Sequence, residues 1–399
     1  MKIYFITSKL NFRTSGGSIE EIDYIIRTLI KLGNEVTVIT AFSSSNDISL
    51  PLPYKVIEEN VRSHGLLGMQ KEVYFLLKKY SLEADIFHVD AHLFMYGAGI
   101  YKLLGGKVPI VAFFNQFLTC WPQYSSSFFP QTKVGILPRA KKKIRWLIER
   151  YVGMFLLKYL DILSYVSPNL RSMYEDFGAR KEKSIVIGDP IDFKSIMEAN
   201  GITPDFYRQR LKRIGPITIL YSSRMSPGKG FDVLLLAFSK LKDKDHFRLI
   251  LGGTGPEAQF VRDMVLRLNL TKYVTLPGWV SKEQLYEYYR TADIFIQADW
   301  WPAGTSISLL YALAFGLPSI LPAGGGLQWN AGKSALYFKY RDVDELARQI
   351  ERLEKDHELR VELSGNCFRR LAEDDMNMEK RIFGLFKEME DKVNSITNR

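Results

Sequence analysis

The feature that most constrains this chain is a repeated alternation of short apolar runs with longer helical patterns. Strands that alternate with helices build parallel sheets, because each crossover helix returns the chain to the same edge of the sheet. We therefore predict an α/β fold with two doubly wound, Rossmann-like sheets. The strands of the first sheet are expected at Lys2–Thr7, Glu35–Thr40, Tyr54–Ile57, Asp85–Val89, Pro109–Phe114, Ile162–Val166 and Ser184–Ile187. Those of the second are expected at Ile217–Tyr221, Phe247–Leu251, Val274–Leu276, Ile294–Gln297, Pro318–Leu321 and Ala335–Phe338.

The length of 399 residues suits two domains of roughly 150–200 residues better than one core. The turn-forming sequence Gly188-Asp189-Pro190 ends the last strand of the first half and indicates the junction. We place an amino-terminal domain at residues 1–188 and a carboxyl-terminal domain at residues 189–375. The helical pattern of residues 376–399 is expected to pack back on the amino-terminal domain.

Two cations follow the first strand of the second half. Arg224 and Lys229 lie in the loop Ser222–Gly230, between that strand and a helix expected to begin near Phe231. Anionic ligands bind at such places, where a parallel strand ends and a helix begins. Arg can grip two oxygens and Lys adds a point charge, so a diphosphate is the predicted ligand. A solvated basic loop is the alternative for this pair taken alone.

Three further segments of the second half fit a ligand site beside this loop. Gly252–Pro256 is a glycine-rich turn after a strand, and Gly278–Val280 follows the next strand. Gly304, Thr305 and Ser306 would present amides and hydroxyls at the start of a predicted helix, Ser306–Phe315. In the first half, the Gly16-Gly17 pair precedes the predicted helix Ile19–Leu32 and lets a ligand approach the backbone closely.

With these motifs in this order, the chain resembles the retaining glycosyltransferases of family four, which have the GT-B fold of two domains facing a cleft. The resemblance implies a UDP- or GDP-sugar donor held mainly by the second domain and an acceptor held by the first. It implies that Arg224 and Lys229 hold the diphosphate and serve catalysis, with no metal or other cofactor required. The donor-binding positions that it implies are Gly16, Gly17, Gly253, Val280, Gly304, Thr305, Ser306, Ile307 and Tyr311.

The chain departs from the family pattern at three positions. The family carries two glutamates eight positions apart in its last motif, and the matching residues here are Ala303 and Tyr311. Neither can act as a carboxylate, although the Tyr311 hydroxyl could donate to a ribose. The family also tends to carry a histidine after the strand Pro109–Phe114, where Phe114 or Asn115 stands here.

Three residues of the first half are candidates for the acceptor side, namely Asn115, His88 and His92. For the histidines, core packing or helix capping at a strand end is the alternative. Their spacing of four would suit a metal on a helix, but His88 ends a predicted strand, so we do not predict zinc. The two cysteines, Cys120 and Cys367, form no disulfide framework, and a reducing cytoplasm is the expected setting.

A basic segment indicates contact with a membrane surface. Residues 133–158 contain eight basic residues and one acid, interleaved with Trp146 and long aliphatic side chains, as in helices that lie on anionic lipids. A solvated basic face is the alternative, and no nucleic-acid-binding motif accompanies the segment. The uncharged stretch of residues 300–332 is long enough to span a bilayer, but Pro302, Pro318 and Pro322 divide it, so we predict a buried helix and strand.

We therefore expect a cytoplasmic enzyme at the membrane face that transfers a sugar from a nucleotide-sugar to a lipid-linked or polysaccharide acceptor. The rival is a protein that keeps the shape and binds nucleotide-sugars without catalysis, which the replacements Ala303 and Tyr311 favour. A nucleic-acid-binding protein that uses residues 133–158 is a third interpretation.

Overall fold

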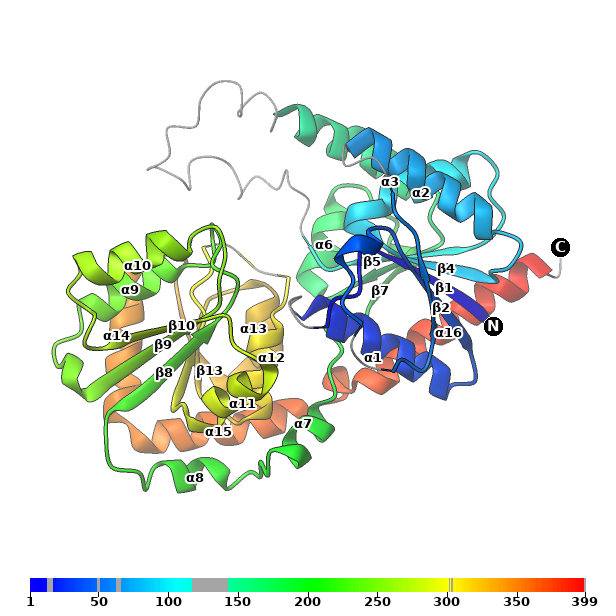
Figure 1. Ribbon diagram of the computed structural model, residues 1–399. Coiled ribbons are helices and arrows are strands. Elements are labelled where there is room, and N and C mark those ends of the chain that lie inside the picture. The colour runs from blue at the N-terminus through cyan, green and yellow to red at the C-terminus, as the bar shows by residue number, and fades with distance from the viewer. Residues whose placement is uncertain are drawn as a thin grey trace. The chain divides into compact units, whose positions relative to one another are not determined.

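The computed structural model describes residues 1–12, 17–48, 51–61, 66–116, 143–300, 302 and 304–397, and the chain forms two compact units (Figure 1). Unit 1 contains Met1–Ile191 and Met378–Arg399, and unit 2 contains Asp192–Asn377. The chain therefore passes into unit 2 a few residues after the predicted junction and returns to unit 1 with its last helix.

Unit 1 is built on a seven-stranded sheet with the order β3-β2-β1-β4-β5-β6-β7, in which all neighbouring strands are parallel. The strands are β1 Lys2–Thr7, β2 Glu35–Thr40, β3 Lys55–Glu58, β4 Ile86–Asp90, β5 Ile110–Phe114, β6 Ile162–Tyr165 and β7 Ser184–Val186. Central strands such as β5 are buried along their whole length, as their apolar sequences require of a sheet covered on both faces.

Helices cover both faces of this sheet. They are α1 Ser18–Lys31, α2 Leu66–Tyr80, α3 Ala91–Leu103, α5 Met154–Leu157, α6 Pro168–Asp176 and α16 Met378–Thr397, with the short turns η1 Ser43–Ser45 and η5 Lys181–Lys183. Residues 143–147 are α-helical and continue through the π-helical turn η4, Ile148–Gly153, into α5. In α1 the buried residues Ile22, Ile25, Ile26 and Leu29 recur at helical spacing and form the face that packs on the core.

Unit 2 contains a six-stranded parallel sheet with the order β10-β9-β8-β11-β12-β13. The strands are β8 Ile217–Ser222, β9 Phe247–Gly252, β10 Val274–Gly278, β11 Ile294–Ile296, β12 Ser319–Pro322 and β13 Ala335–Phe338. The helices are α7 Phe193–Ala199, α8 Phe206–Arg210, α9 Phe231–Ser239, α10 Ala258–Arg267, α11 Lys282–Thr291, α12 Ile307–Ala314, α13 Gly325–Ala331, α14 Val343–Lys355 and α15 His357–Leu371. The short turns are η6 Lys244–His246, η7 Gly332–Ser334 and η8 Asp374–Met376.

Side-chain caps explain where several of these helices begin. Ser281 and Gln284 form a reciprocal capping box at the start of α11. Asp342 accepts a hydrogen bond from the Glu345 amide at the start of α14. In these two helices, a polar side chain that is local in sequence thus accepts from one free amide of the first turn.

All thirteen predicted strands are present, with ends that differ by no more than two residues. The predicted helix Ser306–Phe315 and strand Pro318–Leu321 are α12 and β12, and both are buried in unit 2. Within the described part of the chain, every helix is too short or too polar to cross a bilayer.

Candidate functional site

The strand order of unit 2 indicates the edge of the sheet at which a ligand is expected to bind. The chain builds β8, β9 and β10 toward one side, and then returns to place β11 on the other side of β8. The loops that follow β8 and β11 therefore diverge at the carboxyl edge of the sheet, where doubly wound sheets bind ligands. Arg224 and Lys229 lie in the first of these loops, and Gly304–Ser306 follow the second strand.

The two loops are in backbone contact. The Trp300 amide donates to the Gly228 carbonyl over 2.9 Å. Gly230 has a left-handed backbone (φ 68°), and a methyl group built on it would lie 1.7 Å from the Ala298 carbonyl oxygen. Only glycine fits this position without a shift of the backbone, so the cation-bearing loop is held against the segment that follows β11.

Lys229 has a buried acidic partner. Its Nζ lies 3.5 Å from Oδ1 of Asp299, whose side chain is almost completely buried, while about a third of the Lys229 side chain remains exposed. The Gln297 side chain donates to the other Asp299 oxygen over 2.5 Å. Burial raises the pKa of the Asp299 carboxyl, and the charge of Lys229 opposes that rise. Asp299 therefore pairs with a lysine whose side chain is still partly exposed and can contact a ligand.

Arg224 is the second cation of this loop. It is exposed, and it forms no hydrogen bond or ion pair with the rest of the described chain. An exposed guanidinium beside a lysine at this edge of the sheet can grip the oxygens of an anion.

The glycine-rich turn after β9 packs directly on the Arg224 loop. The Met225 amide donates to the Thr254 carbonyl over 2.8 Å, and the Gly253 amide donates to the Gly278 carbonyl over 2.8 Å. A methyl group on Gly253 would lie 2.0 Å from the Ser223 carbonyl oxygen. The structure thus brings the segments of Gly253 and Val280 together with the cation loop, as a shared site requires.

The start of α12 completes this edge. Ser306 caps the helix by accepting from the Leu309 amide over 3.4 Å, and the Ser308 hydroxyl donates to the Ser222 carbonyl over 2.7 Å. Thr305, Ser306 and Ile307 are partly exposed, whereas Gly304 is buried. The positive end of the helix dipole therefore lies beside the end of β8, where it favours an anion.

Tyr311 belongs to an aromatic cluster in the core of unit 2. Its ring centroid lies 5.4 Å from that of Tyr286 and 5.8 Å from that of Tyr289, both edge-on, and the residue is buried. This packing explains why a large aromatic residue is tolerated there, and contact with a ribose stays a prediction. Ala303 lies outside the described residues.

The acceptor-side candidates of unit 1 differ in their surroundings. Asn115 follows β5, and its buried Oδ1 accepts no hydrogen bond from any described residue. His88 is buried in β4, stacks on Phe5 at 4.2 Å between ring centroids, and has its pKa lowered to about 3 by burial. The structure therefore favours core packing for His88, as a neutral ring.

The His92 side chain and Gly16 lie outside the described residues. The Gly17 carbonyl accepts a hydrogen bond from the Glu21 amide at the start of α1.

Two family models match most of the chain between them. The model described as Glycosyltransferase Family 4 matches residues 16–195, and that described as Glycosyl transferases group 1 matches residues 204–370. The chain belongs to glycosyltransferase family four. Its fold is GT-B, as the structural likenesses below also show.

Similar proteins include two proteins named as synthases and a protein of solved structure. The glycosyltransferase is 26% identical over 206 residues to mannosylfructose-phosphate synthase of Agrobacterium fabrum, covering 48% of this chain and 45% of that protein. It is 24% identical over 282 residues to α-monoglucosyldiacylglycerol synthase of Streptococcus pneumoniae, covering 67% of this chain and 58% of that protein. An Anabaena protein crystallised with UDP and glucose superimposes with a TM-score of 0.71 at 17% identity, over 97% of this chain and 99% of that one. This glycosyltransferase thus spans about half the length of the first two relatives.

Sequence reasoning missed a group of carboxylates in unit 1 of the glycosyltransferase. Glu21 on α1 is buried, and burial followed by the charges of Asp189 and Asp90 raises its pKa well above the usual range. Burial also raises the pKa of Asp90, at the end of β4, from 3.8 to about 6. The position of Asp90 directly after the predicted strand Asp85–Val89 was the available signal. Within the described ranges, no three His, Cys, Asp or Glu side chains are grouped so as to hold a metal ion.

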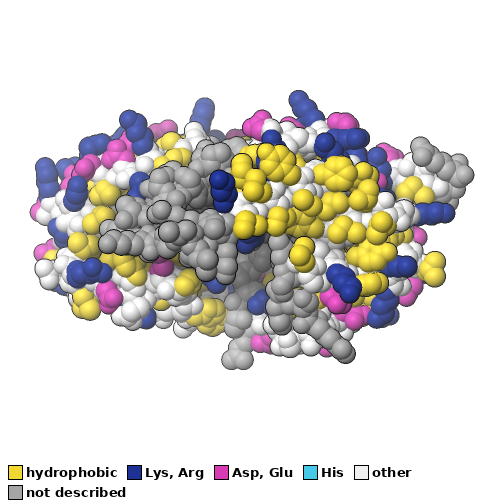
Figure 2. Space-filling view, turned by 90° about the horizontal axis from the view of Figure 1, so that it is seen from above, with side chains coloured by type: hydrophobic (Ala, Val, Ile, Leu, Met, Phe, Trp, Pro, Cys, Tyr) yellow, Lys and Arg dark blue, Asp and Glu magenta, His cyan; other side chains and the backbone are white. Residues whose placement is uncertain are grey.

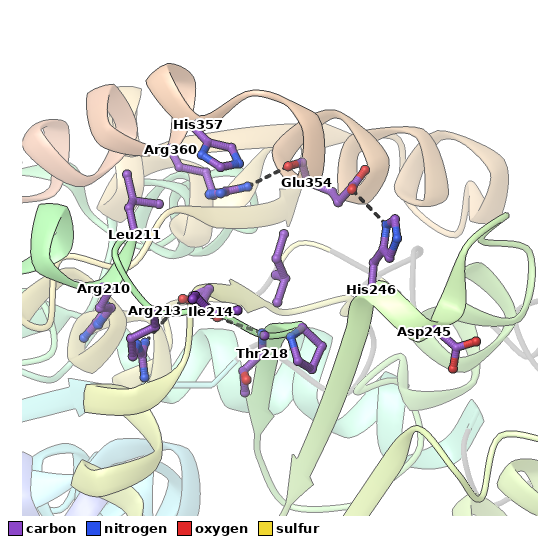
Figure 3. Close-up of a pocket in the computed structure, with 14 residues that line it drawn as sticks. Arg210, Leu211, Arg213, Ile214, Thr218, Asp245, His246, Glu354, His357 and Arg360 are labelled. Atoms are coloured by element: carbon purple, nitrogen blue, oxygen red, sulfur yellow. Dashed lines mark hydrogen bonds and ion pairs between the residues drawn. The ribbon is translucent and has the colours of Figure 1, made fainter.

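A hollow of about 530 Å³ in unit 2 lies at the opposite edge of the sheet, where Ile217 and Thr218 start β8 (Figure 3). Its arginines already serve as helix caps: Arg210 donates to the Arg290 carbonyl at the end of α11 over 2.9 Å, and Arg360 donates to the Glu354 carbonyl at the end of α14 over 2.9 Å. These contacts are structural, so the arginines of this hollow are already occupied by carbonyl groups of the protein.

Proposed function

We propose that this glycosyltransferase transfers a sugar, with retention of configuration, from a UDP- or GDP-sugar to a lipid-linked or polysaccharide acceptor. The observation that carries the proposal is the convergence of Arg224, Lys229 and the start of α12 at the carboxyl edge of β8 and β11. Two cations and a helix dipole at one edge suit a diphosphate. The Anabaena protein of the same fold, crystallised with UDP and glucose, supports a nucleotide-sugar donor.

The reaction needs charge stabilisation more than a dedicated base. When the bond between sugar and diphosphate breaks, negative charge grows on the leaving phosphate. Arg224 and Lys229 would neutralise that charge, and the helix dipole would add to the effect. In a front-face reaction the departing phosphate itself accepts the proton of the acceptor hydroxyl. The protein then contributes by orienting the two substrates and by stabilising the charge of the leaving phosphate.

The acceptor is proposed to be lipid-linked or a surface polysaccharide, reached at the cytoplasmic face of a membrane. The basic segment 133–158 supports this placement, and its described part, residues 143–158, retains exposed lysines at both ends. The name of the Streptococcus pneumoniae relative, a synthase of a glucosylated diacylglycerol, agrees with a lipid acceptor.

Arg224→Ala is the direct test. Transfer from a library of UDP- and GDP-sugars should fall by about 100-fold or more, because a charge that stabilises the leaving group is lost. Arg208→Ala, which removes an exposed arginine on α8, is the matched control and should keep activity. Wild-type rates in Arg224→Ala would refute the assignment of the diphosphate site.

Calorimetry separates the enzyme from a binding protein of the same shape. If UDP or GDP binds and Arg224→Ala weakens it, while no donor yields product, the nucleotide-sugar-binding alternative is favoured. Product formation by Ala303→Glu then measures whether the missing carboxylate limits turnover.

A further inference from the structure

Helix α3 of unit 1 lies unusually close to its neighbours because glycines line its sides. A methyl group on Gly97 would lie 2.7 Å from Cβ of Val73 on α2, and one on Gly99 would lie 2.6 Å from Cβ of Leu156 on α5. The Gly97 amide also donates to the Gln70 side chain over 2.8 Å. Because glycine carries no side chain, α2 and α5 can pack closely against α3 on two sides, and they form the sides of a groove over it.

The result is an apolar groove of about 380 Å³, here called the α3 groove. Its floor contains Tyr96 and Ile100 of α3, and one wall is α2. The other wall is the helical segment η4–α5, with Val152 among its lining side chains. Eight of the ten lining residues are aliphatic or aromatic, and the Gln70 amide group is already used by Gly97.

The surface around the groove is apolar and exposed. Leu67 is 81% exposed, Tyr151 64%, Val152 50% and Phe155 47%. Figure 2 shows hydrophobic side chains gathered over one face of unit 1, the face that carries α2 and α3 in Figure 1. A contiguous exposed apolar surface of this kind marks a binding surface rather than ordinary solvent-facing protein.

The charges on the same elements are mostly positive. α2 and residues 143–159 together carry seven basic side chains against two acids, Glu72 and Glu149. Glu149 is buried and pairs with Arg145. Lys71, beside the groove, and Lys158 are exposed and form no ion pair with a described residue. These lysines are available to anionic headgroups, and their aliphatic stems can lie along the apolar surface.

We propose that the α3 groove seats an acyl chain of an anionic membrane lipid, while the apolar rim enters the bilayer interface. An acyl chain needs no hydrogen-bond partners, and the groove offers few. A protein segment would have to satisfy its backbone polar groups, which this lining does not favour. The positive rim selects the anionic headgroup that follows the chain. The inference rests on the proposed function in one respect, the membrane contact proposed for residues 133–158.

Vesicle flotation tests the rim. The full chain should bind vesicles of phosphatidylcholine and phosphatidylglycerol in equal parts, and bind pure phosphatidylcholine much more weakly. Val152→Glu/Phe155→Glu should weaken binding to the mixed vesicles about tenfold or more. Leu82→Glu/Leu104→Glu adds the same two charges at other exposed positions of unit 1 and should bind like wild type. Equal binding by the first pair, or failure of the wild type to bind, would overturn the proposal.

A substitution that fills the α3 groove distinguishes binding of an acyl chain in the groove from adsorption of the protein to the membrane surface. Val152→Trp should block binding of the fluorescent fatty acid cis-parinaric acid while keeping vesicle binding, because the indole occupies the groove and the rim stays apolar. Tyr151→Trp changes the adjacent exposed residue, which does not line the groove, and should leave the fatty acid bound. Unchanged fatty-acid binding in Val152→Trp would refute an acyl seat at this groove.

These outcomes do not depend on the donor site. UDP or GDP binding should be the same in all four variants, because the substitutions lie in unit 1 and Arg224 and Lys229 lie in unit 2. Loss of vesicle binding with intact nucleotide binding supports the groove proposal. Failure of Arg224→Ala to affect transfer would refute the diphosphate assignment and leave the vesicle result in force.

Discussion

At the scale of single residues, Lys229 and Asp299 form a charge pair of unequal burial. Asp299 is enclosed, and its Oδ1 accepts no described hydrogen bond, so the nearby ammonium is its main compensation on that side. Lys229 is partly exposed and would be solvated without its partner. Removing the lysine should therefore be more harmful than removing the acid, because a buried charge left without a counter-charge is unfavourable.

Lys229→Met should lower the free energy of unfolding by about 1–3 kcal/mol, a range reduced for the exposure of the lysine. Asp299→Asn should be close to neutral, and Lys229→Met/Asp299→Asn should recover most of the loss. Because burial raises the folded-state pKa of Asp299, the folded chain binds its proton more tightly than the unfolded chain. The loss in Lys229→Met should thus be smaller near about pH 4.5 than near about pH 8. Urea unfolding at both values measures this, and a double variant no better than Lys229→Met would contradict it.

At the scale of elements, the proposed donor site depends on loops that contact each other through glycine. Gly230 is the residue just before α9; it has a left-handed backbone, and no room is left for a methyl group beside Ala298. Gly201, after α7, has nearly the same backbone angle (φ 63°), but no heavy atom lies within 4 Å of a methyl group built there. The two glycines separate the effect of backbone angle from the effect of close contact.

Gly230→Ala should lower the free energy of unfolding by more than about 2 kcal/mol and weaken UDP or GDP binding, because the loop must move away from Ala298 and carries Lys229 with it. Gly201→Ala should cost only about 1 kcal/mol, the strain of a left-handed alanine, and leave nucleotide binding unchanged. Thermal unfolding and calorimetry compare the two. Equal losses in both variants would show that backbone angle alone matters at Gly230.

At the scale of the whole molecule, the last helix completes the core of the first unit. α16 follows unit 2 in sequence, yet it contacts α1 and β6, and Ile382, Leu385 and Met389 are fully buried in the unit 1 core. The core of unit 1 therefore contains residues from segments that precede and follow unit 2 in the sequence.

Leu385→Ala should destabilise unit 1 by about 3 kcal/mol, because it leaves a cavity in that core. Phe383→Ala, on the exposed side of the same helix, should lose less than about 1 kcal/mol. Hydrogen exchange should show faster opening of β1 and β4 in Leu385→Ala, with nucleotide binding by unit 2 retained. Protection of β1 and β4 equal to that of wild type would contradict the role of α16.

The sequence alone determined the thirteen strands, the buried helix α12 and the identity of the glycine-rich and cationic loops. Apolar runs of a few residues and glycine-bearing turns are local properties, and parallel strands bring their carboxyl ends to one edge whatever the detailed packing. That is why the Arg224 loop, the Gly253 turn and the start of α12 could be grouped before the structure was known.

Only the tertiary structure decided which side chains are enclosed and by what. Lys229 pairs with Asp299, and His88 is buried against Phe5. The carboxylates around Glu21 come from separate segments, as do the helices α2 and α5 that pack on α3. Each of these contacts joins residues that are distant in the chain. Burial and electrostatic environment arise from such non-local contacts, and a residue's type and spacing do not specify them.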